Sequence, residues 1–231
     1  MLGTIINAAA IAAGVSIGLI FKRGITAKIQ NTIMQGLGLA VLLIGFKTAW
    51  QTENELIPVL SLALGAVVGE YLAIEDKLNK LGGWLESKVG SNHDNVARAF
   101  VTASLMYCIG AMAIMGPMED GLTGKTNILQ VKSALDGISA VIFTSTMGIG
   151  VVFSVIPVFI YQGSITLLAE YVKIFFTENM ITEMNATGGI LIIGIGINIL
   201  GIKKIKVANL LPAVIFAVIF VWLKEIFFNM H

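Results

Sequence analysis

The sequence alternates between short charged segments and long runs that contain no Asp, Glu, Lys or Arg, and these runs limit what the chain can fold into. They span residues 1–21, 29–46, 56–69, 99–118, 137–169, 184–202 and 207–223. About 20 apolar residues in a helix cross the hydrocarbon core of a bilayer, and most of the runs approach that length. Only 13% of the residues are charged, about half the share in a water-soluble domain. We therefore expect an all-α polytopic membrane protein whose main partner is the lipid bilayer.

The run at 137–169 is too long for one crossing and short for two full ones. It contains the helix-interrupting residues Gly148 and Pro157 and an isolated amide at Gln162. Membrane transporters use interrupted helices to line a cavity with freed backbone groups. We expect the run to split near Ser154 to Pro157, which gives about eight crossings with broken or short central helices. A partly re-entrant run is the alternative.

The distribution of positive residues predicts the orientation. With eight crossings, most of the 15 lysines and arginines fall in loops on one side, including Lys22, Arg23 and the turn at Lys203 to Lys206. Short loops rich in lysine and arginine stay in the cytoplasm, which predicts an N-terminus outside the plasma (inner) membrane. The first apolar run precedes its positive charges, the reverse of a signal peptide, so we expect it to be retained as a crossing.

One sizeable polar segment, 74–96, separates the third and fourth crossings. Its apolar residues recur at helical spacing, at Ile74, Leu78, Leu81 and Leu85. This pattern predicts an amphipathic linker helix, either lying on the cytoplasmic membrane surface or packed on the cytoplasmic end of the bundle. The residues 91–95 then form a polar turn.

Two segments of the chain resemble each other. Gly38 to Lys47 reads GLAVLLIGFK and Gly194 to Lys203 reads GIGINILGIK; downstream, Pro58 and Pro212 follow similar pairs of residues. We expect a single membrane domain, 1–231, in which crossings 1–3 and 6–8 form an inverted repeat, the construction of many secondary transporters. Chance similarity between glycine-rich helices, in a chain with 25 glycines, is the alternative. The expected segments are a first repeat at 1–73, the linker at 74–96, a central helix pair at 97–156 and a second repeat at 157–229.

Polar residues inside membrane spans are costly and mark functional candidates. The candidates for a substrate or ion path are Asp136, Lys132, Gln162, Asn7, Asn198, Ser104, Thr144 and Ser145. Lys132 and Asp136 are four residues apart, the spacing of an ion pair on one helix face. Asp136 is either a proton or cation acceptor at a cavity mouth or a carboxylate at a helix start. The amides either line a polar path or bond neighbouring helices.

The sequence offers little for catalysis. It has no phosphate-binding loop, no zinc-spaced cluster of His and Cys and no nucleophile turn, so we expect no enzyme, no catalytic residues, no metal and no cofactor. Its lone cysteine, Cys108, excludes an internal disulfide. A net charge of +1 gives no indication of a basic surface that could bind nucleic acid. Glu119 and Asp120 are expected in an exposed turn, because Gly116, Pro117 and Gly121 flank them.

Several motifs occur in order along the chain: Ser104–Gly116 (SLMYCIGAMAIMG), Gly121–Gly124 (GLTG), Lys132–Gly137, Gly148–Val151, Tyr161–Gly163 (YQG) and Asn209–Pro212 (NLLP). With these motifs the chain resembles the bacterial inner-membrane family of unknown function 554, the YqgA/YdfK type. The resemblance implies a multi-pass bacterial inner-membrane protein with a suspected transport role. It brings no catalytic or binding residues.

Two functions from different classes fit these observations. The first is a small secondary transporter or channel-like carrier for an unidentified small solute or ion. The alternative is a non-transporting membrane scaffold or regulatory subunit, whose polar residues only hold helices together. A homo-oligomer suits a bundle of short spans, but no sequence feature requires one.

Overall fold

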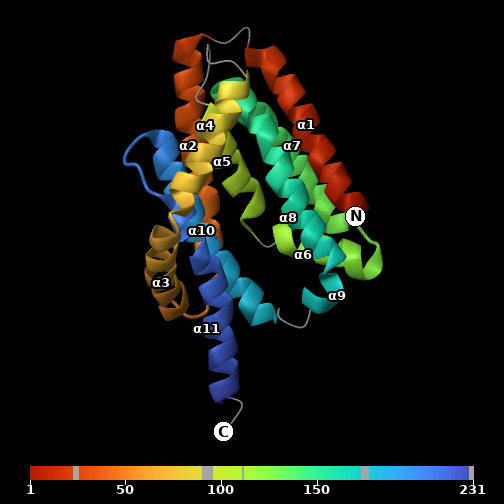
Figure 1. The fold of residues 1–231 in the computed structure, drawn as a ribbon, viewed down its shortest axis with the longest axis vertical. Helices are drawn as coiled ribbons and strands as arrows, with labels where there is room; N and C mark the ends of the chain where they lie inside the picture. The colour runs from red at the N-terminus through yellow and green to blue at the C-terminus, as the bar shows by residue number, and fades with distance from the viewer. Residues whose placement is uncertain (23–25, 90–95, 111, 173–176, 229–231) are drawn as a thin grey trace. The chain divides into compact units, whose positions relative to one another are not determined.

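The computed structural model describes residues 1–22, 26–89, 96–110, 112–172 and 177–228, which form helices and no strands (Figure 1). The chain forms two compact units, each built from segments far apart in the sequence. The first unit takes Met1–Met34, Leu78–Cys108 and Met112–Lys173, and the second takes Gln35–Lys77, Ile109–Ala111 and Ile174–His231. The helices α2 (Ala27–Ala49) and α4 (Ile74–Val89) therefore contribute to both units.

The first unit is built around α7 (Asn127–Met147), a helix of 21 residues. Its other elements are α1 (Leu2–Lys22), α5 (Val96–Cys108), α6 (Met112–Thr123), the 3-10 helix η1 (Ile149–Ser154), α8 (Val155–Leu167) and α9 (Ala169–Val172). The helices α1, α5 and α6 and the helix η1 all pack against α7, and α8 packs against α1 and α6.

Small residues bring α1 and α7 very close together. A Cβ atom added to Gly14 would lie 2.3 Å from the carbonyl oxygen of Gly137, and one added to Gly18 would lie 2.6 Å from that of Val141. Neither position has room for a side chain. Such small-residue contacts, together with interhelical hydrogen bonds, hold helices together where lipid removes the hydrophobic driving force. The close approach puts polar side chains of α1 within bonding distance of α7.

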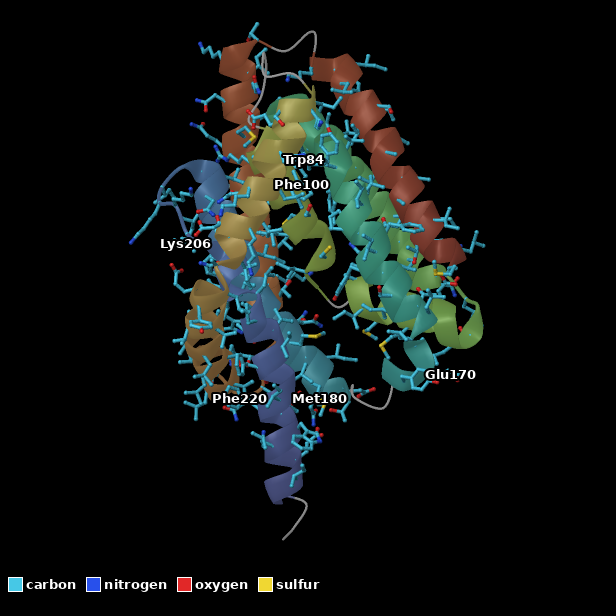
Figure 2. The ribbon with its side chains drawn as sticks, viewed as in Figure 1. Trp84, Phe100, Glu170, Met180, Lys206 and Phe220 are labelled. Atoms are coloured by element: carbon cyan, nitrogen blue, oxygen red, sulfur yellow. The ribbon has the colours of Figure 1, made fainter. Side chains whose placement is uncertain are left out.

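The second unit contains most of α2 together with α3 (Leu56–Leu72), α10 (Glu178–Leu200), the 3-10 helix η3 (Val207–Leu210) and α11 (Pro212–Phe228). Of the candidate membrane spans, α10 is the most buried. An apolar core forms around Ile57, Met180 and Val221, and Phe220 packs against it (Figure 2).

Two pairs of helices in the second unit run antiparallel. On α2, Gly38 lies against Leu200 of α10, and Gly45 lies against Ile193, so residue numbers rise along one helix as they fall along the other. The helix α3 runs antiparallel to η3 and α11 in the same way, with Gly65 against Ala213 of α11 and Gly69 against Asn209 of η3.

The described residues contain five helices that are long and apolar enough to cross a membrane: Leu2–Lys22, Lys28–Ala49, Ile149–Leu167, Glu178–Leu200 and Val207–Ile226. The count rises to 7 if each of two bent pairs, α3 with α4 and α5 with α6, is one span. Large apolar side chains such as Ile20 (72% exposed) and Leu43 (70% exposed) lie on the surface of these helices. The protein is therefore helical and membrane-embedded, while the predicted count of eight remains a prediction.

In the structure, the run at 137–169 is interrupted at a different residue from the predicted one. The helix α7 ends at Met147, and Gly148 follows with a φ of 90°, a left-handed conformation that favours glycine. Pro157 lies in the first turn of α8, where its missing N–H costs nothing. The break is therefore at Gly148 rather than between Ser154 and Pro157.

Two further local predictions differ from the structure. Glu119 and Asp120 lie within α6 rather than in an exposed turn, and Asp120 is buried. Lys132 and Asp136 lie inside α7, well past its first residue, rather than at a charged helix edge. Within the expected linker at 74–96, residues 74–89 form the helix α4, and Trp84 on this helix is exposed (Figure 2). The predicted polar turn at 91–95 lies outside the described residues.

Candidate functional site

Four of the predicted path residues meet inside the first unit and form what we call the polar cluster: Asn7, Lys132, Asp136 and Gln162. Nζ of Lys132 lies 2.7 Å from Oδ2 of Asp136. Nδ2 of Asn7 donates to the same Asp136 oxygen at 3.0 Å and to Oε1 of Gln162 at 3.2 Å. Three helices, α1, α7 and α8, thus supply one connected set of side chains.

Helical periodicity explains why these residues meet. The buried residues of α1 are Gly3, Thr4, Asn7, Ile11, Gly14, Val15 and Gly18, which share one face. Asn7 therefore lies on the same face as the glycines that contact α7. Lys132 and Asp136 are one turn apart and both buried, so they lie on the face of α7 that α1 covers.

The cluster is cut off from solvent. Asn7 and Gln162 have no exposed surface, and the side chains of Lys132 and Asp136 are 6% and 8% exposed. An ammonium and a carboxylate at contact distance neutralise each other, which makes their burial tolerable.

Two atoms of the cluster lack a hydrogen-bond partner among the described residues: Oδ1 of Asn7 and Nε2 of Gln162. Both are buried, and a buried polar atom without a partner costs about 1–3 kcal/mol. One is an acceptor and the other is a donor. Oδ1 of Asn7 can therefore accept up to two hydrogen bonds, and Nε2 of Gln162 can donate up to two.

The hydroxyl candidates Thr144, Ser104 and Ser145 lie in the same unit as the polar cluster. Thr144 on α7 is buried, and its Oγ1 has no partner among the described residues; the same holds for Oγ of Ser104 on α5. Ser145 donates to the carbonyl of Ile142 in its own helix at 2.9 Å. No hydrogen bond that the structure gives connects these three hydroxyls to the polar cluster.

Asn198 lies in the second unit, whereas the other candidates lie in the first. Its Nδ2 donates to the carbonyl of Ile205 at 2.8 Å, and the Ile205 N–H donates to its Oδ1 at 2.7 Å. This side chain closes the turn that follows α10. The arrangement gives Asn198 a structural role in that turn.

Glu183 on α10 is a buried carboxylate that the sequence prediction did not include. It is 3% exposed and accepts three hydrogen bonds: from Oγ1 of Thr52 at 2.6 Å and from the N–H groups of Glu53 and Asn54 at 2.8 and 3.0 Å. It therefore fastens the loop between α2 and α3 to α10. The available sequence signal was its position directly before the charge-free run at 184–202.

A cavity of about 130 Å³ opens beside Glu183 in the second unit. It is lined by Glu53, Ile57, Asn179, Glu183, Val221, Lys224 and Glu225. Two of its three carboxylates have partners: Glu183 accepts the bonds given above, and Glu225 accepts from the Thr177 hydroxyl and the Asn179 amide. The cavity therefore looks like a polar recess at one end of the unit rather than a preformed ion site.

Two carboxylates of α6 also have structural partners. Oδ2 of Asp120 accepts from the N–H of Gly3 at 3.0 Å, and Oε2 of Glu119 accepts from the N–H of Ile128 at 3.1 Å. Both bonds satisfy N–H groups in the first turn of a helix, α1 and α7 respectively. The sequence signal for this role holds for Glu119 alone, which lies shortly before α7, whereas Asp120 bonds a helix far from it in the sequence.

At the other end of the second unit, Lys206 pairs with Glu70. Nζ of Lys206 lies 2.5 Å from Oε1 of Glu70, and the Asn209 amide donates to Oε2 at 2.6 Å. The hydrogen bond and the charge of Glu70 raise the pKa of Lys206 above its usual value. Both side chains are more than half exposed, so the pair is a surface contact of small energetic weight. Figure 2 labels Lys206 in the turn after α10.

Comparison with known proteins gives a consistent picture. The chain is 36% identical to "Uncharacterized membrane protein YdfK" of Bacillus subtilis (strain 168) over 219 residues, which cover 93% of each protein. It is 31% identical to "Uncharacterized protein YqgA" of Escherichia coli (strain K12) over 222 residues, 94% of each. No solved structure matches the chain. The family model described as "Protein of unknown function (DUF554)" matches residues 2–222, and the chain therefore belongs to the DUF554 family.

Proposed function

We propose that this protein is a small secondary transporter or channel-like carrier, which moves a small solute or ion across the bacterial plasma membrane. The polar cluster is its binding site. The chain acts without enzymatic chemistry, and its N-terminus faces outward, as the distribution of lysines and arginines favours.

The polar cluster is the observation that carries this proposal. A lysine, an aspartate and two amides lie buried in a unit whose outer surface is rich in exposed apolar side chains. Burial of such groups in a membrane is expensive, and they usually face a pathway when they are present. Two cluster atoms, Oδ1 of Asn7 and Nε2 of Gln162, have no partner among the described residues. A purely structural network would gain stability by pairing them.

The helix pairing supports the inverted repeat that such a carrier uses. The expected counterparts are α1 with α8, α2 with α10 and α3 with α11. Each pair packs inside one unit. In the first, Thr4 approaches Thr166 and Asn7 bonds Gln162, so α1 and α8 run antiparallel like the other two pairs. In an inverted repeat, each helix of one half runs opposite to its counterpart in the other half. Two such halves let a transporter open alternately to one side of the membrane and the other.

The scaffold alternative also has an observation in its favour. Oδ2 of Asp136 is satisfied by both Lys132 and Asn7, and the glycine contacts between α1 and α7 are those of a tightly packed helix pair. On this view the cluster holds three helices in register. The two functions differ in whether purified protein moves anything across a bilayer.

Flux through liposomes tests the proposal. Ion movement is read as current after concentration jumps, and neutral-solute movement as light scattering after osmotic jumps. We expect wild-type protein to move at least one class of solute faster than protein-free liposomes, and Asn7→Leu to lose that excess. Ser133→Ala is the matched control, because this buried α7 hydroxyl bonds the Leu129 carbonyl of its own helix. Wild-type liposomes that match protein-free ones for every solute would establish the scaffold function instead.

A further inference from the structure

The hydrogen bonds of the two cluster amides can be counted atom by atom. An Asn or Gln side chain has two N–H donors and a carbonyl acceptor. Both N–H bonds of Asn7 are used, one toward Asp136 and one toward Gln162. Oε1 of Gln162 accepts one of these bonds. What remains is the acceptor Oδ1 of Asn7 and both N–H donors on Nε2 of Gln162, and neither atom has a partner among the described residues.

The amides do not satisfy each other, although they touch. Two carboxamides can form a reciprocal pair in which each donates to the other. Here Asn7 donates to Gln162 at 3.2 Å, and the return bond is missing from the described contacts. The reason is the third partner: Asp136 holds the other N–H of Asn7 at 3.0 Å and so fixes the orientation of the Asn7 amide. Asp136 is thus a positioning residue for the Oδ1 atom of Asn7.

The charges of the cluster are already balanced. Lys132 and Asp136 form a contact pair, with 2.7 Å between nitrogen and oxygen. An additional ion would leave an unpaired charge in a buried site, which costs far more than an unmade hydrogen bond. The ammonium lies beside Oδ2 of Asp136, where it would repel an incoming cation, while the carboxylate repels an anion from Lys132.

These two observations lead to a single ligand class. We infer that the polar cluster takes a small neutral solute that donates one hydrogen bond to Oδ1 of Asn7 and accepts one from Nε2 of Gln162. Small hydroxyl and amide compounds have this pair of functions, and water is the smallest member of the class. The inference rests on the proposed carrier function and narrows it: the cargo crosses by facilitated passage and carries no net charge.

Stopped-flow light scattering on proteoliposomes tests this inference. The probes are water, glycerol and urea, and the impermeant osmolyte is sucrose; sodium, potassium and chloride are followed as currents in the same preparations. We expect wild-type vesicles to pass at least one neutral probe faster than protein-free vesicles, with no ion current above background. Gln162→Met keeps the side-chain volume but loses the amide. It is expected to slow that probe by about 3- to 10-fold, the cost of one lost neutral hydrogen bond.

The controls separate this effect from misfolding. Ser133→Ala should retain wild-type flux. If Gln162→Met does not fold to a monodisperse protein, Asn7→Ser replaces it, since this variant keeps a small polar group but removes Oδ1. The unfolding midpoint of each variant is recorded alongside its flux. A structural amide would lower the midpoint without changing flux per folded molecule.

Three results would overturn the inference, and they differ in what they leave standing. Ion currents with no neutral flux would remove the neutral-solute class but leave the carrier function. Neutral flux that Gln162→Met and Asn7→Ser leave unchanged would move the path away from the cluster. Absence of both kinds of flux would remove the inference and the proposed function together.

Discussion

Nζ of Lys132 lies 2.7 Å from Oδ2 of Asp136, one helical turn away in the interior of α7, and both side chains are less than one-tenth exposed. A buried ion pair contributes little net stability, but the removal of one partner leaves an uncompensated charge. This relationship sets the energetics of the polar cluster.

Lys132→Met is therefore expected to lower the free energy of unfolding by about 3–5 kcal/mol, because Asp136 then has no counter-charge. The double variant Lys132→Met/Asp136→Leu should recover most of that loss, because it buries no charge. Reversible unfolding in mixed micelles measures both variants. If the double variant is as unstable as the single one, the pair contributes through packing, and the electrostatic account of it is wrong.

The α1–α7 contact predicts a contrast between two glycines. Gly14→Ala places a methyl group where a Cβ would lie 2.3 Å from a backbone carbonyl, and overpacking of this kind costs about 1–3 kcal/mol. Gly36→Ala on α2 has no atom within 4 Å of the new methyl group. It should stabilise its helix by up to about 1 kcal/mol. Thermal unfolding of the two variants should move in opposite directions, and equal shifts would contradict the packing.

Glu183 is expected to be a stability residue of the second unit. Glu183→Gln removes the charge from a buried group that accepts three hydrogen bonds, at a cost of about 1.5–3 kcal/mol. Glu178→Gln on the same helix is the control, because Glu178 is exposed. Chemical denaturation compares the two. A Glu183→Gln variant as stable as Glu178→Gln would show that the carboxylate does not fasten the α2–α3 loop.

The antiparallel pairing of α2 and α10 gives a topological prediction. Glu53 follows α2 and Lys204 follows α10, so the two residues lie at opposite ends of the second unit. In a Cys108→Ala background, Glu53→Cys should react with an impermeant thiol reagent from outside the cell, and Lys204→Cys only from the cytoplasm. Reaction of Lys204→Cys from outside would show that the orientation is the reverse of the predicted one. The lysine distribution would then no longer support the proposed topology.

The sequence identified the four residues of the polar cluster as candidates because of a physical rule. Asn7, Lys132, Asp136 and Gln162 are polar residues in otherwise apolar helices, and such residues turn away from lipid toward one another. Their spacing indicated the pair of Lys132 with Asp136, but the bonds of Asn7 to Asp136 and Gln162 could not be read from the sequence, since they depend on how closely α1 approaches α7 and α8. The recurrence of glycine on the Asn7 face of α1 was the available signal for that approach.

The sequence was less informative at the edges of the apolar runs. Glu183 and Asp120 lie where a charge usually faces the aqueous interface, yet both are buried, because each satisfies N–H groups of a neighbouring segment. The helix break after Met147 was also misplaced. Proline is the stronger helix breaker in general, but Pro157 lies in a first turn that tolerates it, and the left-handed φ of Gly148 ends α7 instead.

Chemical accessibility of the cluster tests the carrier account without knowledge of the cargo. Gln162→Cys is made in the Cys108→Ala background, and a small neutral methanethiosulfonate is applied to right-side-out and inside-out vesicles. Val158→Cys, one turn earlier on α8 and equally unexposed, is the control for a packed position. A carrier predicts that the cysteine at position 162 reacts from both faces while the one at position 158 reacts from neither. Equal protection of both positions from both faces would contradict the account.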